Sequence, residues 1–246
     1  MANEYDNIDN IGRTYQSFNS KAEKAMHDYY HKQEVKTVTN LLKKMKLKNY
    51  ETLVDLGSSH GYWYNNYKKM GFKKLFGIDI AKERVLQAKQ RGYDEVHTCN
   101  AYELPFDNES KQCIISNNVL IHVLQDSDKL RIFNEVKRVL KKDGIFIFSI
   151  ANAKGHGFEI DTTRGVSRFS TPKTILDLLK NSGLVVENIM PSFYTSPRIG
   201  AHPYVAGFST KFVFPIIDLL LKSMKNLSIV KVFYIGVRKK NRIKFC

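Results

Sequence analysis

The chain has 246 residues, of which 43% are hydrophobic, so it is long enough for one domain with a large core but short for two full domains. Its three scattered cysteines form neither a C-x-x-C pair nor a metal-ligand spacing, which argues against a metal site and for thiols in a reducing cytoplasm. The net charge of +15 indicates either a lysine-rich solvated surface, the reading we favour, or anionic partners, among which nucleic acid is less favoured because no zinc-finger, RNP-like or arginine-rich tract is present.

The N-terminal segment 1–10 contains acidic residues and no apolar core, so we expect no signal peptide and a cytoplasmic protein. Helical and strand patterns then alternate along the chain. The expected elements are helix 29–46, strand 52–56, helix 63–70, strand 75–80, helix 82–91, strand 95–99, strand 113–117, helix 128–140, strand 144–150, helix 172–182, strand 184–190 and strand 230–237. We expect Gly92 to end the third helix, Ser127 or Asp128 to cap the next, and Thr171-Pro172 to open the last. This order predicts one α/β domain over 1–246, with a doubly wound, mostly parallel sheet covered on both faces.

The segment 52–61 combines an apolar strand with a turn of small residues, and the strand that follows ends on Asp79. Glycines in such a turn let the backbone approach a nucleotide, and a carboxylate about twenty residues later accepts hydrogen bonds from a ribose. A dinucleotide site requires G-x-G-x-x-G, but these positions hold Gly57, Ser59 and Tyr62. A Walker ending is also absent, so the turn favours an adenosine without a pyrophosphate.

Four segments in this order resemble the class I S-adenosylmethionine (SAM)-dependent methyltransferases, specifically their small-molecule branch. Residues 55–61 resemble the D-x-G-x-G-x-G turn with Ser59 at the middle glycine, and residues 100–106 are similar to D-A-x-x-L-P-F. Residues 113–122 resemble the fourth strand and the turn under the methionine moiety, and 130–148 the helix that leads through L-K-P-G-G into strand five. The resemblance implies a Rossmann-like, seven-stranded sheet with an antiparallel last strand, and SAM as the cofactor, with S-adenosylhomocysteine as its product.

The resemblance also implies a set of cofactor contacts. These fall on Arg13, Tyr15, Asp55, Gly57, Ser58, Gly61, Asp79, Ile80, Asn100, Ala101 and Asn117. Asn100 stands where the family usually has an acid, but its side-chain oxygen can still accept from the adenine amino group. Residues 1–30 are similar to an N-terminal helical lid, in which Tyr15 would touch the cofactor carboxylate or cover the methyl group.

Methyl transfer depends mainly on holding the nucleophile, methyl carbon and sulfur in line, and a base helps when the acceptor is a hydroxyl. His122 is the candidate base, because it follows the fourth strand at the edge where such sheets bind ligands. The alternative is a structural histidine that caps the loop. Tyr15 is the second catalytic candidate, and His60 is expected to be a turn residue. Four further residues in predicted loops could bind an anionic acceptor or simply be exposed: His156, Arg164, Arg168 and His202.

A long insertion, 191–227, precedes the last strand and contains the apolar run 212–222. Asp218, Lys222 and Lys225 interrupt the run, which is too short and too charged to span a bilayer. It could be a helix packed on the core, a dimer contact, or an interfacial segment that binds a lipid-linked substrate. We favour a substrate-side cap or a dimer element, which leaves monomer and homodimer both open.

The sequence therefore predicts a methyltransferase that acts on a small polar or anionic acceptor, such as a sugar, a nucleotide-linked sugar or a phosphorylated metabolite. A non-catalytic SAM-binding scaffold is an alternative from a different class. RNA or protein methylation is a third. Residues 116–119 read Ser-Asn-Asn-Val where amide-methylating members carry N/D-P-P-Y/F, which disfavours that chemistry.

Overall fold

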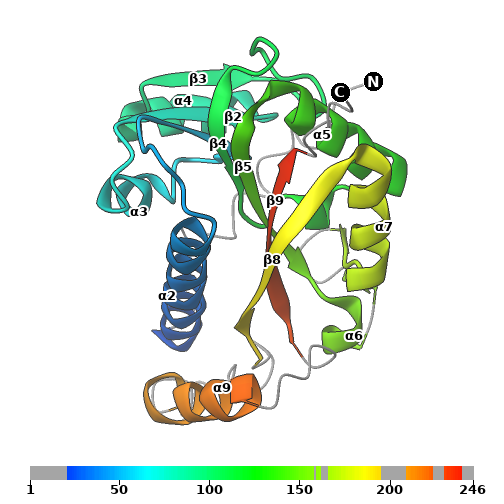
Figure 1. The fold of residues 1–246 in the computed structure, drawn as a ribbon. Helices are drawn as coiled ribbons and strands as arrows, with labels where there is room; N and C mark the ends of the chain where they lie inside the picture. The colour runs from blue at the N-terminus through cyan, green and yellow to red at the C-terminus, as the bar shows by residue number, and fades with distance from the viewer. Residues whose placement is uncertain (1–20, 158, 162–165, 195–208, 224–229, 240–246) are drawn as a thin grey trace.

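The computed structural model describes residues 21–157, 159–161, 166–194, 209–223 and 230–239 (Figure 1). Its centre is a seven-stranded sheet. In spatial order the strands are β3 (Glu95–Thr98), β2 (Lys74–Asp79), β1 (Thr52–Leu56), β4 (Lys111–Ser116), β5 (Leu140–Ala151), β9 (Val232–Lys239) and β8 (Leu184–Phe193). Arg13, Tyr15, Arg164 and His202 lie outside the described residues.

The first five strands pair in parallel, and β9 runs antiparallel to both of its neighbours, β5 and β8. The carboxyl ends of β1, β4, β5 and β8 therefore lie at one edge of the sheet. This arrangement confirms the predicted Rossmann-like sheet with an antiparallel last strand. A separate two-stranded ribbon is formed by β6 (Ile160–Asp161) and β7 (Ser167–Arg168).

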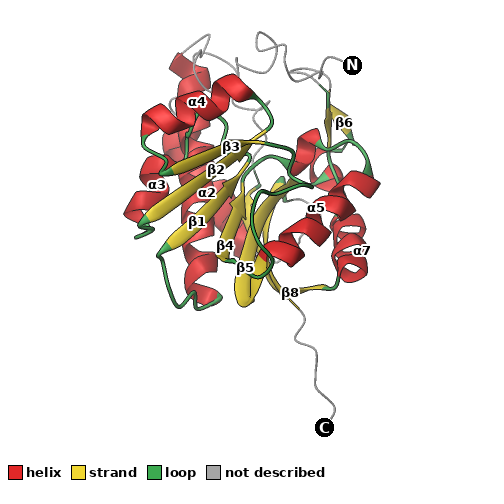
Figure 2. Cartoon of the chain, turned by 90° about the horizontal axis from the view of Figure 1, so that it is seen from above, coloured by secondary structure: helices red, strands yellow, loops and turns green. Residues whose placement is uncertain are grey.

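Helices cover both faces of the sheet (Figure 2). One face carries α2 (Lys21–Lys44), α3 (Tyr64–Lys69) and α4 (Lys82–Arg91), and the other carries α5 (Asp126–Val139) and α7 (Pro172–Ser182). The remaining elements are short: η2 (Leu120–His122), α6 (Ala153–His156), the π-helical turn η3 (Ser209–Val213) and α9 (Phe214–Ser223). None of the helices within the described ranges is long and apolar enough to cross a membrane.

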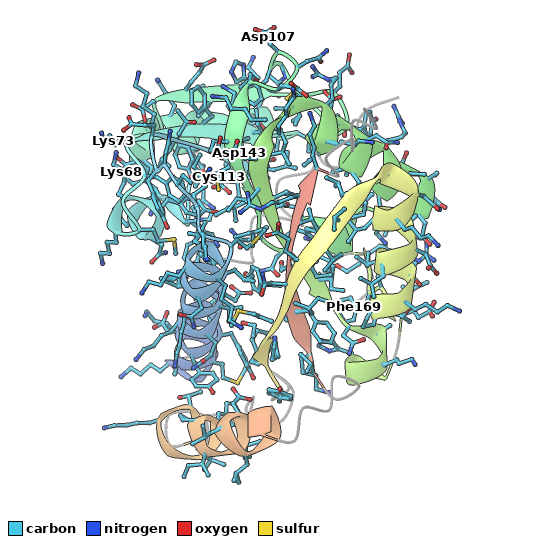
Figure 3. All side chains as sticks on the ribbon, viewed as in Figure 1. Lys68, Lys73, Asp107, Cys113, Asp143 and Phe169 are labelled. Carbon is cyan, nitrogen blue, oxygen red and sulfur yellow. The ribbon has the colours of Figure 1, made fainter. Side chains whose placement is uncertain are left out.

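Each face has its own hydrophobic core. Leu41, Trp63 and Tyr67 belong to the core on the α2 side, which also contains Cys113 of β4 (Figure 3). On the α5 side, Phe146 and Phe148 stack at 4.8 Å between ring centroids, and Phe133 packs against both. A strand that is buried on both faces reads as a continuous apolar run, which explains the buried sequence 145–148.

Several helices and strands begin or end at other residues than the sequence predicted. Helix α2 begins at Lys21, so residues 21–30 of the expected lid are its first turns. Helix α5 begins at Asp126 after Gln125, which makes no side-chain cap, so the expected cap at Ser127 or Asp128 is wrong. The earlier start has a physical reason, because the Asp126 carboxylate there pairs with the buried amine of Lys129.

The strands on the β5 side also extend beyond their expected bounds. β5 starts at Leu140, where it pairs with Lys111, instead of after a loop. β8 runs on to Phe193 through Pro191, past the expected start of the insertion. Proline is tolerated there because β8 is the edge strand, and its register shifts between Pro191 and Phe193.

Phe148→Ala should lower the free energy of unfolding by about 3 to 5 kcal/mol, because it leaves a cavity beside two other rings in a fully buried core. Urea denaturation measures the change. The matched control is Leu86→Ala, which truncates a side chain that is 54% exposed on α4 and should change stability by less than about 0.5 kcal/mol. Equal losses in the two variants would contradict this picture of the core.

Candidate functional site

The glycine turn, residues 57–61, follows β1 at the carboxyl edge of the sheet. Gly57, Ser59 and Gly61 have φ angles of 83°, 49° and 79°. Ser59 therefore adopts the left-handed conformation that the replaced glycine would supply, at a modest steric cost. A Cβ on Gly57 would lie 2.1 Å from Val119 Cγ2, so only glycine allows the turn to approach the loop after β4 this closely.

Asp79, at the end of β2, fixes this turn. Its Oδ2 accepts a hydrogen bond from the Ser59 amide at 2.8 Å, and its Oδ1 accepts one from the Ala81 amide at 3.0 Å. Ala81 precedes the first residue of α4, and from that helix Arg84 donates to Ser59 Oγ at 3.1 Å. Each carboxylate oxygen keeps a second lone pair for a ligand. Ile80, the next residue, is half-buried at the same strand end.

Asp55 lies beneath the turn and is only 2% exposed. Its oxygens accept from the hydroxyls of Tyr93 at 2.5 Å and Tyr67 at 3.1 Å. Burial raises the pKa of Asp55 to about 7, although both tyrosine bonds oppose the shift. The contact that the resemblance implied for Asp55 is with the cofactor, whereas the structure shows both of its oxygens bound to tyrosines of the core.

Asn117 continues this network after β4. Its Nδ2 donates to the Tyr67 hydroxyl at 2.7 Å, and its Oδ1 accepts from the Tyr234 hydroxyl of β9 at 3.0 Å. Tyr67 thus links the carboxyl ends of β1 and β4. The structure brings Asp55, Gly57 and Asn117 into one hydrogen-bonded edge, with Ser58 buried beside Gly77 of β2.

Glu34 is a site residue that sequence reasoning missed. It reaches from α2 to accept from Asn118 Nδ2 at 3.0 Å, and the Asn118 amide donates to Ser149 Oγ of β5 at 2.7 Å. These two bonds hold both the side chain and the backbone of Asn118, which has a φ of 58°, just before Val119. Burial raises the pKa of Glu34 to about 7. The sequence did contain a signal for this role, because Glu34 is an acid between Tyr30 and Val38 on the apolar face of an amphipathic helix.

His122 ends η2, the short helical turn that follows this loop. Burial lowers its pKa, the nearby Arg84 lowers it further, and Asp79 opposes both effects. The imidazole is therefore neutral near pH 7, which is the form that can accept a proton. The structure brings His122 into the electrostatic range of Asp79 and Arg84, which come from the other side of the glycine turn.

Asn100 and Ala101 follow β3 and are half-buried. The Glu103 amide donates to the Asn100 carbonyl at 3.0 Å, which forms a turn. Helix α5 fixes the next residues, because Glu135 accepts from the Leu104 amide at 2.7 Å and Arg138 donates to the Leu104 carbonyl at 3.0 Å. The segment 100–106 is thus anchored by α5, which covers the face of the sheet opposite to α2.

Two of the four expected substrate residues are described. Arg168 in β7 donates to the Leu124 carbonyl at 2.7 Å and pairs with Asp126 at 3.4 Å, so it holds the loop that follows η2. His156 lies at the end of α6, with its ring centroid 4.6 Å from that of Phe169. The contacts described for Arg168 and His156 do not include any residue of the glycine turn.

A cluster of histidine and aromatic rings covers the α2 side of the turn. His27 and His31 are one turn apart on α2; the Tyr62 hydroxyl lies 3.3 Å from His27 Nδ1, and Asn66 Nδ2 lies 2.9 Å from His31 Nε2. Burial lowers the pKa values of His31 and His60 to about 4. These rings are neutral near pH 7, and they join α2 to the start of α3.

Comparisons with known proteins find similarity to methyltransferases. Residues 54–148 match a family profile described as "Methyltransferase domain". The chain is 31% identical over 132 residues to an uncharacterised protein of Methanocaldococcus jannaschii, covering 54% of this chain and 49% of that one. It is 33% identical over 110 residues to a ribosomal protein L11 methyltransferase of Dictyoglomus thermophilum, covering 42% of this chain and 33% of that one. The chain thus spans half or less of these curated relatives.

Among solved structures, the magnesium protoporphyrin IX methyltransferase of Synechocystis PCC 6803, which contains bound SAM, superposes with a TM-score of 0.60. The identity is 13%, and the match covers 95% of this chain and 91% of that one. At this identity the likeness establishes the fold alone.

Glu34→Gln should flatten the pH dependence of stability. The pKa of Glu34 is raised from 4.5 to about 7, so its contribution is fully present below about pH 4.5 and is lost as the pH rises through 7. The glutamine keeps an acceptor for Asn118 but cannot ionise. We expect the wild type to lose about 1 to 3 kcal/mol more than the variant between about pH 5 and pH 8.

Urea unfolding at the two pH values measures this difference. Asp55 has a pKa raised in the same direction, but it is present in both proteins and cancels. His31, 4.0 Å from Glu34, supplies no positive charge in this range, because its pKa is lowered to about 4. Parallel pH profiles for the two proteins would show that Glu34 ionises normally.

Proposed function

We propose that the chain is a class I SAM-dependent methyltransferase that transfers the SAM methyl group to a small polar or anionic acceptor. Candidate acceptors are a sugar, a nucleotide-linked sugar or a phosphorylated metabolite. The observation that carries the proposal is the glycine turn held by Asp79 on one side and approached by the loop of Val119 and His122 on the other. The cytoplasmic location expected from the sequence stays a prediction.

The residues at this edge fit the cofactor. Asp79 keeps lone pairs for a ribose, and Asn100 and Ala101 lie after β3, where the adenine would bind. Asn117 and the lid residues Arg13 and Tyr15 would hold the methionine part. Bound SAM supplies an electrophilic methyl group on its sulfonium.

The protein's own contribution is orientation and proton transfer. Positioning alone can lower the barrier of such a reaction by up to about 7 to 11 kcal/mol. The hydrogen bonds from Tyr67 and Glu34 to the loop after β4 would contribute to this positioning, because they hold Asn117 and Asn118 in place. His122 would accept the proton of an acceptor hydroxyl on a ring nitrogen. Arg84 and the net charge of +15 favour an acceptor that carries negative charge.

A protein acceptor is the second candidate. It is favoured by the similarity of part of the chain to a ribosomal protein L11 methyltransferase. Labelled SAM incubated with separate pools of small metabolites, proteins and RNA distinguishes the candidates. Label in the metabolite pool supports the main proposal, and label in the protein pool supports the second. SAM binding without transfer to any pool would instead favour a non-catalytic scaffold.

Asp79→Asn should weaken SAM binding by about 1 to 3 kcal/mol, because it removes a charge-assisted acceptor at the end of β2. The matched control is Asp94→Asn. Asp94 also accepts from a backbone amide of β2, that of Leu75, but at the opposite end of the strand, so this variant should bind SAM as the wild type does. Isothermal titration calorimetry measures both affinities, and an unchanged affinity in Asp79→Asn would remove this residue from the cofactor site.

His122→Gln should lower the rate of methyl transfer by about 10²- to 10⁴-fold, the usual contribution of a general base, with little change in SAM affinity. His97→Gln is the control, because His97 pairs with Glu95 on β3, away from the loop after β4. Single-turnover assays with labelled SAM and the responding pool give the rates. Wild-type rates in His122→Gln would leave His122 with the structural role that the sequence also allowed.

A further inference from the structure

Helix α9 is held against the protein by two side chains one turn apart. Phe214 is buried with its ring centroid 5.8 Å from that of Tyr29 of α2. Asp218 is also buried, and it accepts from the Tyr29 hydroxyl at 2.5 Å and from the Tyr194 amide at 2.9 Å. The inward side of α9 thus combines a ring and a hydrogen-bonded carboxylate.

The outward side of α9 is aliphatic. Ile216, Ile217, Leu219 and Leu220 are 59%, 36%, 70% and 60% exposed. At about 100° per residue Ile216, Leu219 and Leu220 lie on the side of the helix opposite Phe214 and Asp218, and Ile217 lies on its flank. A helix of a globular protein normally faces water with polar residues, so this contiguous apolar surface indicates an interaction site.

Helix α9 is connected to the candidate active site through α2 and the carboxyl edge of the sheet. α9 crosses the lower ends of α2 and β8 (Figure 1), and β8 ends at the same edge of the sheet as β1 and β4. Tyr29, which contacts α9, and Glu34, which contacts the loop after β4, both belong to α2. Their separation along the helix is about 7.5 Å at a rise of about 1.5 Å per residue.

The positive net charge of the chain favours an anionic partner for this apolar surface. Two copies of a chain with a net charge of +15 repel one another, whereas an anionic surface attracts each of them. Lys211 is exposed in η3, the turn that precedes α9. The solvent side of α2 carries further exposed lysines, Lys21, Lys32 and Lys36, and also Lys24, which pairs with Asp28. An exposed aliphatic helix surface on a strongly basic chain suits a helix that lies in the plane of an anionic bilayer.

We propose that α9 is an interfacial helix that binds an anionic lipid surface through Ile216, Leu219 and Leu220. The lipid headgroups would then lie beside the carboxyl edge of the sheet. The substrate consequence rests on the proposed methyltransferase function: the acceptor is the polar or anionic head of a lipid-anchored molecule.

The test uses the full chain and two vesicle compositions. One contains phosphatidylcholine alone, and in the other about a third of the lipid is phosphatidylglycerol. Ile216→Ser/Leu220→Ser removes two outward side chains and leaves Phe214 and Asp218 in place. Leu86→Ser is the matched control, because it removes an aliphatic side chain that is 54% exposed on α4. Circular dichroism verifies that each variant is folded.

We expect the wild type and Leu86→Ser to sediment with the anionic vesicles and much less with the neutral ones. Binding of Ile216→Ser/Leu220→Ser should fall by about tenfold or more, since each aliphatic side chain withdrawn from water contributes about that factor. Absence of wild-type binding to anionic vesicles, or equal binding by the double variant, would overturn the proposal. A dimer in light scattering that the double variant dissociates would also overturn it, because a second copy would then cover the surface.

Calorimetry with SAM on the same preparations separates the two proposals. SAM binding without vesicle binding refutes the lipid surface and leaves the methyltransferase function intact. Vesicle binding without SAM binding refutes the function and leaves the interfacial helix intact.

Discussion

The Tyr67 hydroxyl is the interaction on which the site edge depends. It donates to Asp55 at the end of β1 and accepts from Asn117 after β4, so one buried group fixes the relative positions of two parallel strands. A buried carboxylate is costly unless it is hydrogen-bonded, and Tyr93 completes the second bond of Asp55. Asn117 passes the constraint on to Tyr234 of β9. Buried core residues therefore hold the strand ends beside the glycine turn, while Asp79 holds the turn itself.

The elements that sequence alone predicted well are those determined locally. Helix α4 has its expected bounds, because Gly92 ends it in a left-handed conformation with a φ of 117°. Helix α7 begins as expected, since Thr171 accepts from the Thr174 amide and Pro172 takes the first helical position. The glycine turn was recognisable for the same reason, and Ser59 adopts the left-handed backbone that its motif position requires.

Features that depend on distant partners were not predictable. Glu34 and Asn118 are 84 positions apart, and Tyr93 and Asp55 are 38 apart, so no local pattern links them. The start of α5 depends on Asp126 meeting Lys129 and Arg168, the latter from the β6–β7 ribbon. Similarly, the extent of β8 follows from its pairing with β9 as an edge strand. Local chemistry thus indicated the cofactor edge, while its supports required the three-dimensional structure.

The contact between residues 57 and 119 limits how the loop after β4 can diverge. Val119 Cγ2 occupies the volume that a side chain at position 57 would need, and the positive φ of Gly57 independently requires glycine. The constraint is one-sided: position 119 can become smaller at the cost of a void, but position 57 cannot become larger. In related chains with altered acceptor loops, position 119 can therefore vary, while the glycine that directly follows β1 should stay unchanged.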